Sequence, residues 1–290
     1  MSLRDRLTAL IQYPLPHHLL SRLMFWVTRC RWRPFKIAFT RFIIKRFDID
    51  MSVAAEQDLD SYQHFNEFFT RPLKPEARPI ASEADTIACP VDGTVSQLGA
   101  IEDGRVYQAK GHDYSLKTLL GGLDHLQERF AGGQFATIYL SPRDYHRIHM
   151  PLAGTLSETV YVPGRLFSVN PATTRAIPGL FARNERMVTI FETEHGPMAV
   201  ILVGAIFVAG IETVWSGNYG EQTFRPFEHF IGKNLPQVSL EKGDEMGRFN
   251  MGSTVVLLFG PGHMNWNKSL QADQTVNMGQ SIGSIKQSLD

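Results

Sequence analysis

Residues 247–259 read Gly-Arg-Phe-Asn-Met-Gly-Ser-Thr-Val-Val-Leu-Leu-Phe. The apolar run at the end predicts a buried strand, because short runs of β-branched and large aliphatic side chains favour that state. Gly252 and Ser253 stand directly before this run. Glycine has no Cβ, so it tolerates a strained turn and lets other groups approach its carbonyl closely. The alternative interpretation is an ordinary turn before a strand, which is the usual role of an isolated Gly-Ser-Thr.

The chemistry that this pair permits is cleavage of the chain by its own hydroxyl. If a base removes the proton of Ser253, the oxygen can attack the carbonyl of Gly252 and convert the amide into an ester. Elimination then breaks the chain and leaves a dehydroalanine at position 253. Hydrolysis of that group gives a pyruvoyl group and ammonia. This interpretation requires a base elsewhere in the chain.

Charge is distributed unevenly along the 290 residues, of which 43% are hydrophobic and 20% charged. The net charge is zero, but residues 1–50 hold ten Lys and Arg against three Asp and Glu, and the remainder holds nineteen against twenty-six. A basic arm on an acidic body predicts an anionic surface as a partner, and no nucleic acid is expected. The two cysteines, Cys30 and Cys89, provide no disulfide framework and favour a reducing compartment.

The basic arm carries two apolar stripes at helical spacing, formed by Leu19, Leu20, Leu23, Val27 and by Phe35, Phe39, Phe42, Ile43, Phe47. Arginines and lysines lie among them, and Trp26 and Trp32 flank the junction. This pattern is typical of helices that lie in a membrane interface, and the alternative is that the stripes pack on the protein's own core. A cleaved signal peptide is not expected, whereas the composition leaves a mitochondrial presequence open. The uncharged apolar run 198–211 is too short for a bilayer span and predicts a strand.

The rest of the chain predicts an α+β fold in which N-terminal amphipathic helices lie on a mainly antiparallel β catalytic core. A short helix is expected near residues 62–70, where Asn66, Glu67 and Arg71 are interpreted as capping or packing residues. Short strands and glycine turns follow from about residue 86, interrupted by one or two helices in 115–131. Residues 135–140, 187–192 and 198–208 predict strands, residues 216–243 a loop, and the tail after Trp266 a poorly ordered segment. We divide the chain into an arm, 1–57, and a core, 58–290.

A second dense stretch, 140–151, reads Leu-Ser-Pro-Arg-Asp-Tyr-His-Arg-Ile-His-Met-Pro and places His146 and His149 three residues apart. They could bind a metal ion, but the sequence offers no cysteine or carboxylate partner at ligand spacing, so no metal is expected. They could also be ordinary histidines, or one could be a general base, which is the common role of histidine near neutral pH. Asp92, followed by Gly93, reads on its own as a turn residue.

Taken together, these stretches resemble the phosphatidylserine decarboxylase family, of the bacterial membrane-associated type. The resemblance covers most of residues 58–262, in the family's order, and its most specific part is the histidine stretch. It is carried by Phe65-Asn66-Glu67-Phe68-Phe69, Asp92-Gly93, 140–151, Tyr161-Val162-Pro163-Gly164, Phe181-Ala182-Arg183-Asn184-Glu185-Arg186 and Gly247-Arg248-Phe249. The family's cleavage motif is Leu-Gly-Ser-Thr, and here Met251, which is similar in volume and polarity, replaces the leucine.

The resemblance implies that Asp92, His149 and Ser253 form a triad for self-cleavage between Gly252 and Ser253. Cleavage would give a large chain, 1–252, and a small chain, 253–290, that stay together as one body. Ser253 would become a covalent pyruvoyl cofactor, which forms a Schiff base with the amine of phosphatidylserine and takes up the electrons that decarboxylation releases. His146 is the implied group for decarboxylation or proton transfer. The products would be phosphatidylethanolamine and carbon dioxide.

The resemblance also favours the membrane interpretation of the arm. It implies a peripheral enzyme of the cell membrane, on the cytoplasmic side, that docks on an anionic surface without a transmembrane span. The sequence leaves open whether processed units form a homodimer. For the phosphate of the substrate, Arg143, Arg147, Arg183 and Lys110 are candidates by charge alone.

Three other functions compete with this one. A serine hydrolase could use the same triad without cleavage, although the Gly-x-Ser-x-Gly elbow is missing. A pyruvoyl decarboxylase for a small soluble amino acid would have no need of the basic arm. A lipid-binding protein without activity would leave the chain uncleaved.

Overall fold

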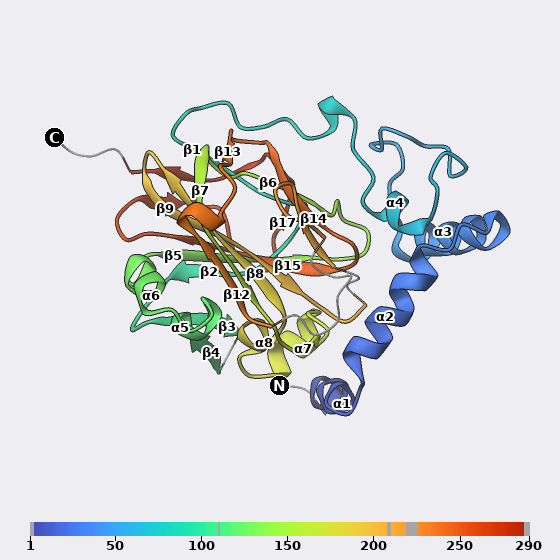
Figure 1. Ribbon diagram of the computed structural model, residues 1–290, viewed down its shortest axis with the longest axis horizontal. Coiled ribbons are helices and arrows are strands. Elements are labelled where there is room, and N and C mark those ends of the chain that lie inside the picture. Colours follow the sequence, from blue (N-terminus) through green and yellow to red (C-terminus); the bar gives the residue numbers. More distant parts are fainter. Residues whose placement is uncertain (1–2, 110, 208–209, 219–225, 287–290) are drawn as a thin grey trace.

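The computed structural model describes residues 3–109, 111–207, 210–218 and 226–286. Long helices occupy the N-terminal part of the chain, and strands with short helices fill the rest (Figure 1), which confirms the α+β prediction. The α-helices of the described residues are α1 (Leu3–Gln12), α2 (His17–Thr28), α3 (Arg33–Phe47), α4 (Phe65–Phe69), α5 (Leu116–Leu119), α6 (Asp124–Phe130), α7 (Pro171–Ala176) and α8 (Leu180–Arg183). Two short 3-10 helices are η1 (Pro75–Ala77) and η2 (Gly232–Asn234).

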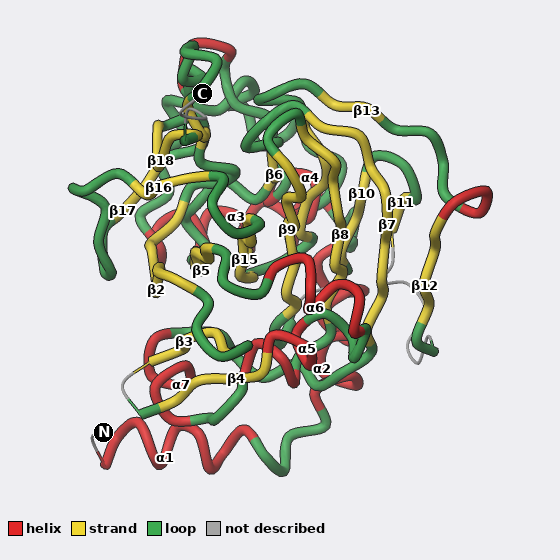
Figure 2. Tube along the Cα trace, turned by 90° about the vertical axis from the view of Figure 1, so that its left-hand side faces the viewer, coloured by secondary structure: helices red, strands yellow, loops and turns green. Residues whose placement is uncertain are grey.

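Helices α1, α2 and α3 follow one another along one side of the β core (Figure 1). Figure 2 shows α1 below the core, next to α7. Two contacts fasten the arm there: the guanidinium of Arg175 donates to the carboxylate of Asp5, and the backbone N–H of Ser168 donates to the side chain of Gln12. Helix α3 starts at Arg33 with Pro34 in its first turn, a position that suits proline because its fixed φ is helical and its missing N–H is not needed there.

A nine-stranded antiparallel sheet forms the centre of the core, with β15 between β9 and β5. The order is β12-β7-β8-β9-β15-β5-β2-β17, and β13 also pairs with β7. Its strands are β2 (Gly93–Ala100), β5 (Gln134–Leu140), β7 (Gly154–Val162), β8 (Arg186–Thr193), β9 (Gly196–Gly204), β12 (Glu228–Ile231), β13 (Ser239–Leu240), β15 (Ser253–Phe259) and β17 (Thr275–Val276).

Smaller sheets lie around this one. Strands β11 (Gly217–Asn218), β10 (Ile211–Thr213), β14 (Glu245–Phe249) and β6 (Arg147–His149) form a four-stranded sheet in that order. Strands β1 (Thr86–Ala88), β18 (Ser281–Ile285) and β16 (Met264–Trp266) form a three-stranded one, and β3 (Arg105–Ala109) pairs with β4 (His112–Ser115). All pairings between these strands are antiparallel.

Both faces of β15 are buried, which explains its uninterrupted apolar sequence. Val255, Leu257 and Phe259 belong to one core cluster, together with Ile148 of β6 and Phe249 of β14. The alternate residues Val256 and Leu258 belong to a second cluster, into which α5 and α6 pack. Successive side chains of a strand point to opposite faces, so the sequence of β15 assigns each of its residues to one of these two layers.

Two segments differ from the sequence predictions. The expected loop at 216–243 contains β11, β12 and β13 in its described part, where Phe230 and Leu240 pack against the first core cluster. The expected poorly ordered tail is wrong as far as residue 286, because β17 and β18 pair with β2 and β1. Strand β18 looks polar in the sequence because small residues lie beside its two buried isoleucines. Glycine is required at position 283, because a Cβ there would lie 2.7 Å from the carbonyl oxygen of Asn265.

Candidate active site

Ser253 is the first residue of β15, directly after the proposed cleavage point. Its partners across the sheet are Leu140 on β5 and Gly204 on β9. The residue is fully buried, and its hydroxyl has no hydrogen-bond partner among the described residues. Because it alternates with Thr254, Ser253 points to the face that carries Val255, toward the layer of β6 and β14. A buried hydroxyl without a partner is unusual and identifies this position as one where structure alone does not explain the side chain.

Gly252 lies in open surroundings. A Cβ added there would meet no heavy atom within 4 Å, and the backbone is not in the left-handed region. The strained turn that glycine would permit is therefore not what this position requires. The open space beside its Cα shows that close packing does not require glycine here either.

The residues before the cleavage point are held by the N-terminal helices. The side-chain amide of Asn66, on α4, donates to the side-chain oxygen of Asn250 at 2.9 Å, and both residues are buried. Met251 packs against a buried, mainly aromatic cluster, on which Phe39 and Ile43 of α3 also pack; its members are Ile49, Tyr62, Phe65, Phe68 and Phe69. The position where methionine replaces the family's leucine is thus an apolar contact with this cluster, which either side chain can make.

We expect Asn66→Leu to slow self-cleavage while the protein still folds. The substitution leaves the buried amide of Asn250 without its partner, which costs about 1–3 kcal/mol of stability. It also loosens the segment that positions the carbonyl of Gly252. The measurement is the time course of chain cleavage in a cell-free translation, together with thermal unfolding. Gln63→Leu, an exposed neighbour on the same segment, is the matched control, and equal cleavage rates for the two variants would contradict this role of Asn66.

His146 is completely buried, and its ring centroid lies 4.0 Å from that of Phe69. Its Nδ1 lies 2.8 Å from the carbonyl oxygen of Asp144 and must donate to it, so Nε2 carries the lone pair. This Nε2 has no partner within the described chain. Burial lowers the pKa of His146 to about 3, helped by the charge of Arg71 and opposed by the hydrogen bond to Asp144. The ring is therefore a neutral acceptor.

This lowered pKa makes stability depend on pH in a defined direction. Between about pH 3 and pH 6.5, the unfolded chain binds a proton at position 146 that the folded chain does not, so stability falls on acidification. One such group changes the free energy of unfolding by about 1.4 kcal/mol per pH unit. In a Ser253→Ala background, urea unfolding at pH 6.5 and 4.5 should show a smaller loss for His146→Gln than for His146. Equal losses would show that His146 is not the group responsible.

His149 forms two hydrogen bonds that fix its tautomer. Nδ1 lies 2.7 Å from the carbonyl oxygen of Gly243 and donates to it, and Nε2 lies 3.1 Å from the hydroxyl of Tyr145, which donates to the ring. Burial lowers the pKa of His149, although the Gly243 hydrogen bond and the charge of Glu245 act in the opposite direction. The ring is therefore neutral at physiological pH and presents a basic Nε2.

Asp92 is buried just before β2 and is paired with an arginine. Arg78 binds its carboxylate through Nε at 2.8 Å and Nη2 at 2.6 Å, and the backbone N–H of Met278 donates to Oδ1 at 2.8 Å. This pairing raises the pKa of Arg78. Met278 belongs to the proposed small chain, so Asp92 also connects the two expected chains.

The predicted triad is only partly assembled. The backbone N–H of His149 donates to the carbonyl of Pro90, which brings the β6 segment to the segment of Asp92. Within the described residues, however, the side chains of Asp92 and His149 are bonded to other groups, and Ser253 has no partner. The carbonyl of Gly243 occupies the orienting position that the resemblance assigns to Asp92. The roles of Asp92, His149, His146 and Ser253 therefore stay predictions.

Two residues of the site, Arg78 and Tyr145, were not singled out from the sequence, and Arg71 was interpreted there as a capping or packing residue. All three line a cavity of about 260 Å³ together with Asp92 and Asp144. Burial raises the pKa of Tyr145 to about 12, so its hydroxyl keeps its proton. The Asp-Tyr-His order within 140–151 could have suggested Tyr145, whereas the pairing of Arg78 with Asp92 has no signal in the sequence.

A second cavity, of about 690 Å³, lies between the arm and the core. Apolar and aromatic groups line much of it, including Phe47, Tyr139 and Val169, and Arg46 and Arg143 contribute charge. Tyr139 is the cross-strand partner of Thr254, so one lining residue lies on the strand next to β15.

The four cations proposed for the phosphate differ in position. Arg143 lines both cavities and is more than half exposed. Arg147 donates to Glu245 and to the carbonyl of Thr70, and Arg183 lies over the rings of Phe167 and Tyr13. Lys110 lies outside the described residues. Arg143 is thus the candidate that combines an open side chain with a place beside the cleavage site.

Comparison with known proteins assigns the chain to a family. A family model described as phosphatidylserine decarboxylase matches residues 65–284, and a second, described as PSD, matches residues 7–48. The chain is 55% identical to the phosphatidylserine decarboxylase proenzyme of Pseudomonas putida, over 98% of this chain and all of the relative. It is 54% identical to that of Pseudomonas aeruginosa, over 99% of this chain and all of the relative. The chain therefore belongs to the phosphatidylserine decarboxylase family and is a decarboxylase of phospholipid metabolism.

Proposed function

We propose that this protein decarboxylates phosphatidylserine to phosphatidylethanolamine with a pyruvoyl group made from its own Ser253. The observation that carries the proposal is the position of the Ser253 hydroxyl, which lies buried directly after Gly252, without a partner among the described residues, on the face of β15 that carries Val255. The hydroxyl of Thr254 also lacks a partner among the described residues, but it points to the opposite face of the strand.

The cleavage step uses the hydroxyl of Ser253, the carbonyl of Gly252 and a base. His149 is the proposed base, because its lone pair is on Nε2 and burial keeps the ring neutral. Attack forms an ester from the amide, and loss of the proton at the α-carbon of residue 253 then expels the carboxylate of Gly252. Addition of one water to the dehydroalanine releases ammonia and completes the pyruvoyl group.

The fold keeps both products of this cleavage in place. Strand β15 is hydrogen-bonded to β5 and β9 along its whole length, and β17 and β18 pair with strands of the large chain. Of the strands named here, the small chain would contribute β15, β17 and β18. The new chain end at residue 253 would therefore stay between β5 and β9.

The pyruvoyl group would supply an electrophilic carbonyl that condenses with the substrate amine and takes up the electrons released when carbon dioxide leaves. The protein's own residues would bind the lipid and move a proton. His146, a neutral ring with a free Nε2, is the proposed group for the proton that the product receives. For the lipid, the larger cavity would supply an apolar and aromatic lining, and Arg46 and Arg143 would supply charge for the phosphate; Arg143 also lines the smaller cavity together with Asp92.

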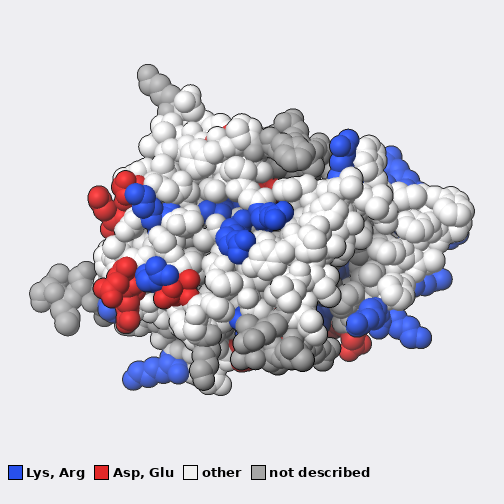
Figure 3. All heavy atoms as spheres, turned by 90° about the horizontal axis from the view of Figure 1, so that it is seen from below, with Lys and Arg blue, Asp and Glu red and all other residues white. Residues whose placement is uncertain are grey.

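We also propose that the arm docks on an anionic membrane surface of the cell, on its cytoplasmic side. Its stripes are divided: Phe39, Ile43 and Phe47 pack on the protein, whereas Leu19, Trp26, Trp32 and Phe42 are between 61% and 68% exposed. In Figure 3 uncharged surface and blue Lys and Arg side chains gather at the end of the molecule where Figure 1 places the arm, and acidic groups gather at the other end. Large exposed apolar groups with a cationic border favour an interfacial position. Among the described helices, no single one has both the length and the apolar character that a bilayer crossing demands.

The test is to trap the substrate on the small chain. Purified protein is mixed with phosphatidylserine vesicles and cyanoborohydride, which reduces the condensation product to a stable amine, and the masses of both chains are then measured. We expect the mass of the chain that begins at residue 253 to increase by that of the reduced lipid adduct, and the mass of the large chain to stay unchanged. Labelling by free serine to the same extent would favour the small-amino-acid alternative, and no labelling by either would contradict the proposal.

Vesicle flotation tests the docking of the arm separately. We expect the double variant Trp26→Ser, Trp32→Ser to bind vesicles containing phosphatidylserine at least about tenfold more weakly, because two exposed aromatic side chains lose their place in the interface. Val214→Ser, at an exposed position after β10, is the control outside the arm. Unchanged binding of the double variant would exclude this surface as the docking site.

A further inference from the structure

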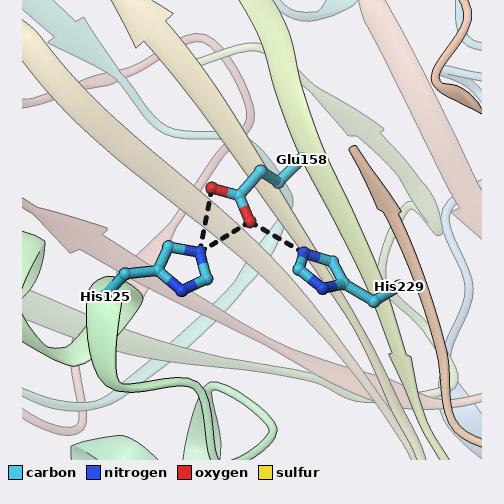
Figure 4. Close-up of side chains that lie close together, drawn as sticks. All are labelled: His125, Glu158 and His229. Atoms are coloured by element: carbon cyan, nitrogen blue, oxygen red, sulfur yellow. Dashed lines mark hydrogen bonds and ion pairs between the residues drawn. The ribbon is translucent and has the colours of Figure 1, made fainter. Parts of the chain in front are cut away.

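Three side chains far apart in the sequence converge on one point at the edge of the large sheet. Figure 4 shows that His125 of α6 and His229 of β12 both turn toward Glu158 of β7. Nε2 of His125 lies 3.0 Å from Oε2 of Glu158, and Nε2 of His229 lies 2.9 Å from the same oxygen. The two rings are roughly parallel, with centroids 6.0 Å apart. The cluster lies outside the candidate active site.

Strand pairing and helix packing bring these three side chains to one face of the large sheet. His229 is paired with Val160 across the sheet, so Glu158, two residues away on β7, is its diagonal neighbour on the same face. The pairing of β7 with β8 shifts between Leu156 and Glu158, and such a bulge re-aims the side chains beside it. Helix α6 packs over this face through Leu126 and Phe130, which brings His125 above the sheet.

The spacing of the three groups suits a small metal ion. Each of the three residues offers one ligand atom, and these three atoms lie within 4.8 Å of one another. Tetrahedral zinc, bound by nitrogen and oxygen at 2.0–2.1 Å, requires ligand atoms about 3.3 Å apart. The two shortest N···O distances are only slightly below that value, so small shifts of side chains would admit the ion.

Burial and charge also favour a cation here. The Glu158 side chain is 6% exposed, whereas those of His229 and His125 are 22% and 47% exposed, so solvent and ions can reach the imidazoles. Arg129 lies 3.9 Å from Glu158 but binds Glu192 more closely, at 2.6 Å. With neutral imidazoles, Glu158, Glu192 and Arg129 leave a formal charge of minus one.

We propose that His125, Glu158 and His229 bind one Zn²⁺ ion, which fastens the edge strand β12 to β7 and to α6. Two imidazoles and one carboxylate are a ligand set that zinc commonly takes, and a water molecule would complete the coordination on the exposed side. The role is structural, because the cluster is built on elements other than those that carry Ser253. An ion at this place would hold a strand whose sheet pairing is confined to one side.

The proposal departs from the expectation of no metal, which rested on the neighbourhood of His146 and His149. The three ligands have no motif in common, because 33 residues separate His125 from Glu158 and 71 separate Glu158 from His229. Only the pairing of β12 with β7 and the packing of α6 bring them together.

The experiment consists of two titrations of the purified, chelator-treated enzyme. Binding of Zn²⁺ is measured by calorimetry, and binding of Co²⁺ is measured by the visible absorption of the bound ion. We compare the wild type with His125→Asn and His229→Asn, and with His195→Asn as a histidine outside the cluster. We expect one Zn²⁺ more per chain in the wild type and the control than in either variant, or binding at least about 100-fold weaker in the variants. Cobalt should give the intense absorption of a tetrahedral site only where the three ligands are intact.

The outcomes separate this proposal from the hydrogen-bonded cluster without metal. Equal stoichiometry and affinity in the wild type and both variants would overturn the zinc site and leave two imidazoles that donate to Glu158. If His229→Asn does not fold, the exposed position of His125 keeps the comparison available through His125→Asn. Thermal unfolding gives an independent measure, since added Zn²⁺ should raise the melting temperature of the wild type and of His195→Asn but not of the variants. Decarboxylase activity is measured alongside, and its loss in all proteins would concern the proposed function rather than the zinc site.

Discussion

Ser253→Ala is expected to yield a single full-length chain with decarboxylase activity reduced by at least about 1,000-fold. Alanine removes the only atom that could attack the carbonyl of Gly252 and the atom from which the pyruvoyl group would form. The substitution should leave the fold intact, because the hydroxyl of Ser253 has no partner among the described residues and the site is fully buried. Gel electrophoresis measures the cleavage, and release of radioactive carbon dioxide from carboxyl-labelled phosphatidylserine measures the activity.

The neighbouring residue provides a matched control. Thr254 is also buried with an unpartnered hydroxyl, but strand alternation turns it to the opposite face of the sheet. Thr254→Val, which keeps the shape and removes the hydroxyl, should therefore cleave at nearly the wild-type rate. Full activity of an uncleaved Ser253→Ala protein would contradict the pyruvoyl mechanism. If chain cleavage were blocked in Thr254→Val but not in Ser253→Ala, the attacking hydroxyl would be that of Thr254 and the role proposed for Ser253 would be wrong.

His149→Asn is expected to have the second largest effect, a decrease of about 100-fold to 10,000-fold in the rate of self-cleavage, which is the range for loss of a general base. Asp92→Asn should have a smaller effect, because the carbonyl of Gly243, rather than Asp92, holds Nδ1 of His149 in the structure. Both rates are measured as the disappearance of the precursor after a pulse of cell-free synthesis.

Stability must be separated from chemistry in this comparison. Arg78 is only 19% exposed and is paired with Asp92, so Asp92→Ala would leave a partly buried charge unpaired and could cost about 3 kcal/mol. Asp92→Asn keeps the shape and the hydrogen bond from the Met278 N–H, and Tyr145→Phe tests the hydroxyl on the other side of the ring. If Asp92→Asn slows cleavage as much as His149→Asn without loss of stability, the imidazole must turn from Gly243 to Asp92 before it reacts.

Strand β15 shows how much of the fold could be predicted from the sequence. Its continuous apolar run required burial on both faces, and the structure places it in the middle of the large sheet. The tail could not be predicted in the same way, because β17 and β18 are short and hold together through pairing with distant strands. Small residues such as Gly283 suggest disorder when only the sequence is considered, whereas in the fold they allow strands to approach each other closely.

The arm illustrates a second limit. Helical periodicity predicted where apolar stripes lie, but a stripe that packs on the protein and one that faces outward have the same spacing. The structure shows both within α3, where Ile43 is packed and Phe42 is exposed. Helix α1, whose Leu10 and Ile11 are also exposed, was not recognised from the sequence.

For the site, the motifs selected candidate residues but did not predict how they are bonded. Asp92, His146, His149 and Ser253 were selected from the sequence, and the structure brings their segments to the same part of the core. The partners of these residues, Arg78, Gly243 and Tyr145, follow from tertiary contacts that a single sequence does not record. The contacts of Asn250 with Asn66 and of Met251 with the cluster around α4 likewise arise only in the folded chain.

The first measurement should be the intact mass of the purified wild-type protein under denaturing conditions. We predict two chains, residues 1–252 and 253–290, with the small chain lighter by one ammonia than a peptide that begins with an unmodified Ser253. A single chain of 32.7 kDa that retains Ser253, in a preparation with decarboxylase activity, would contradict a pyruvoyl enzyme.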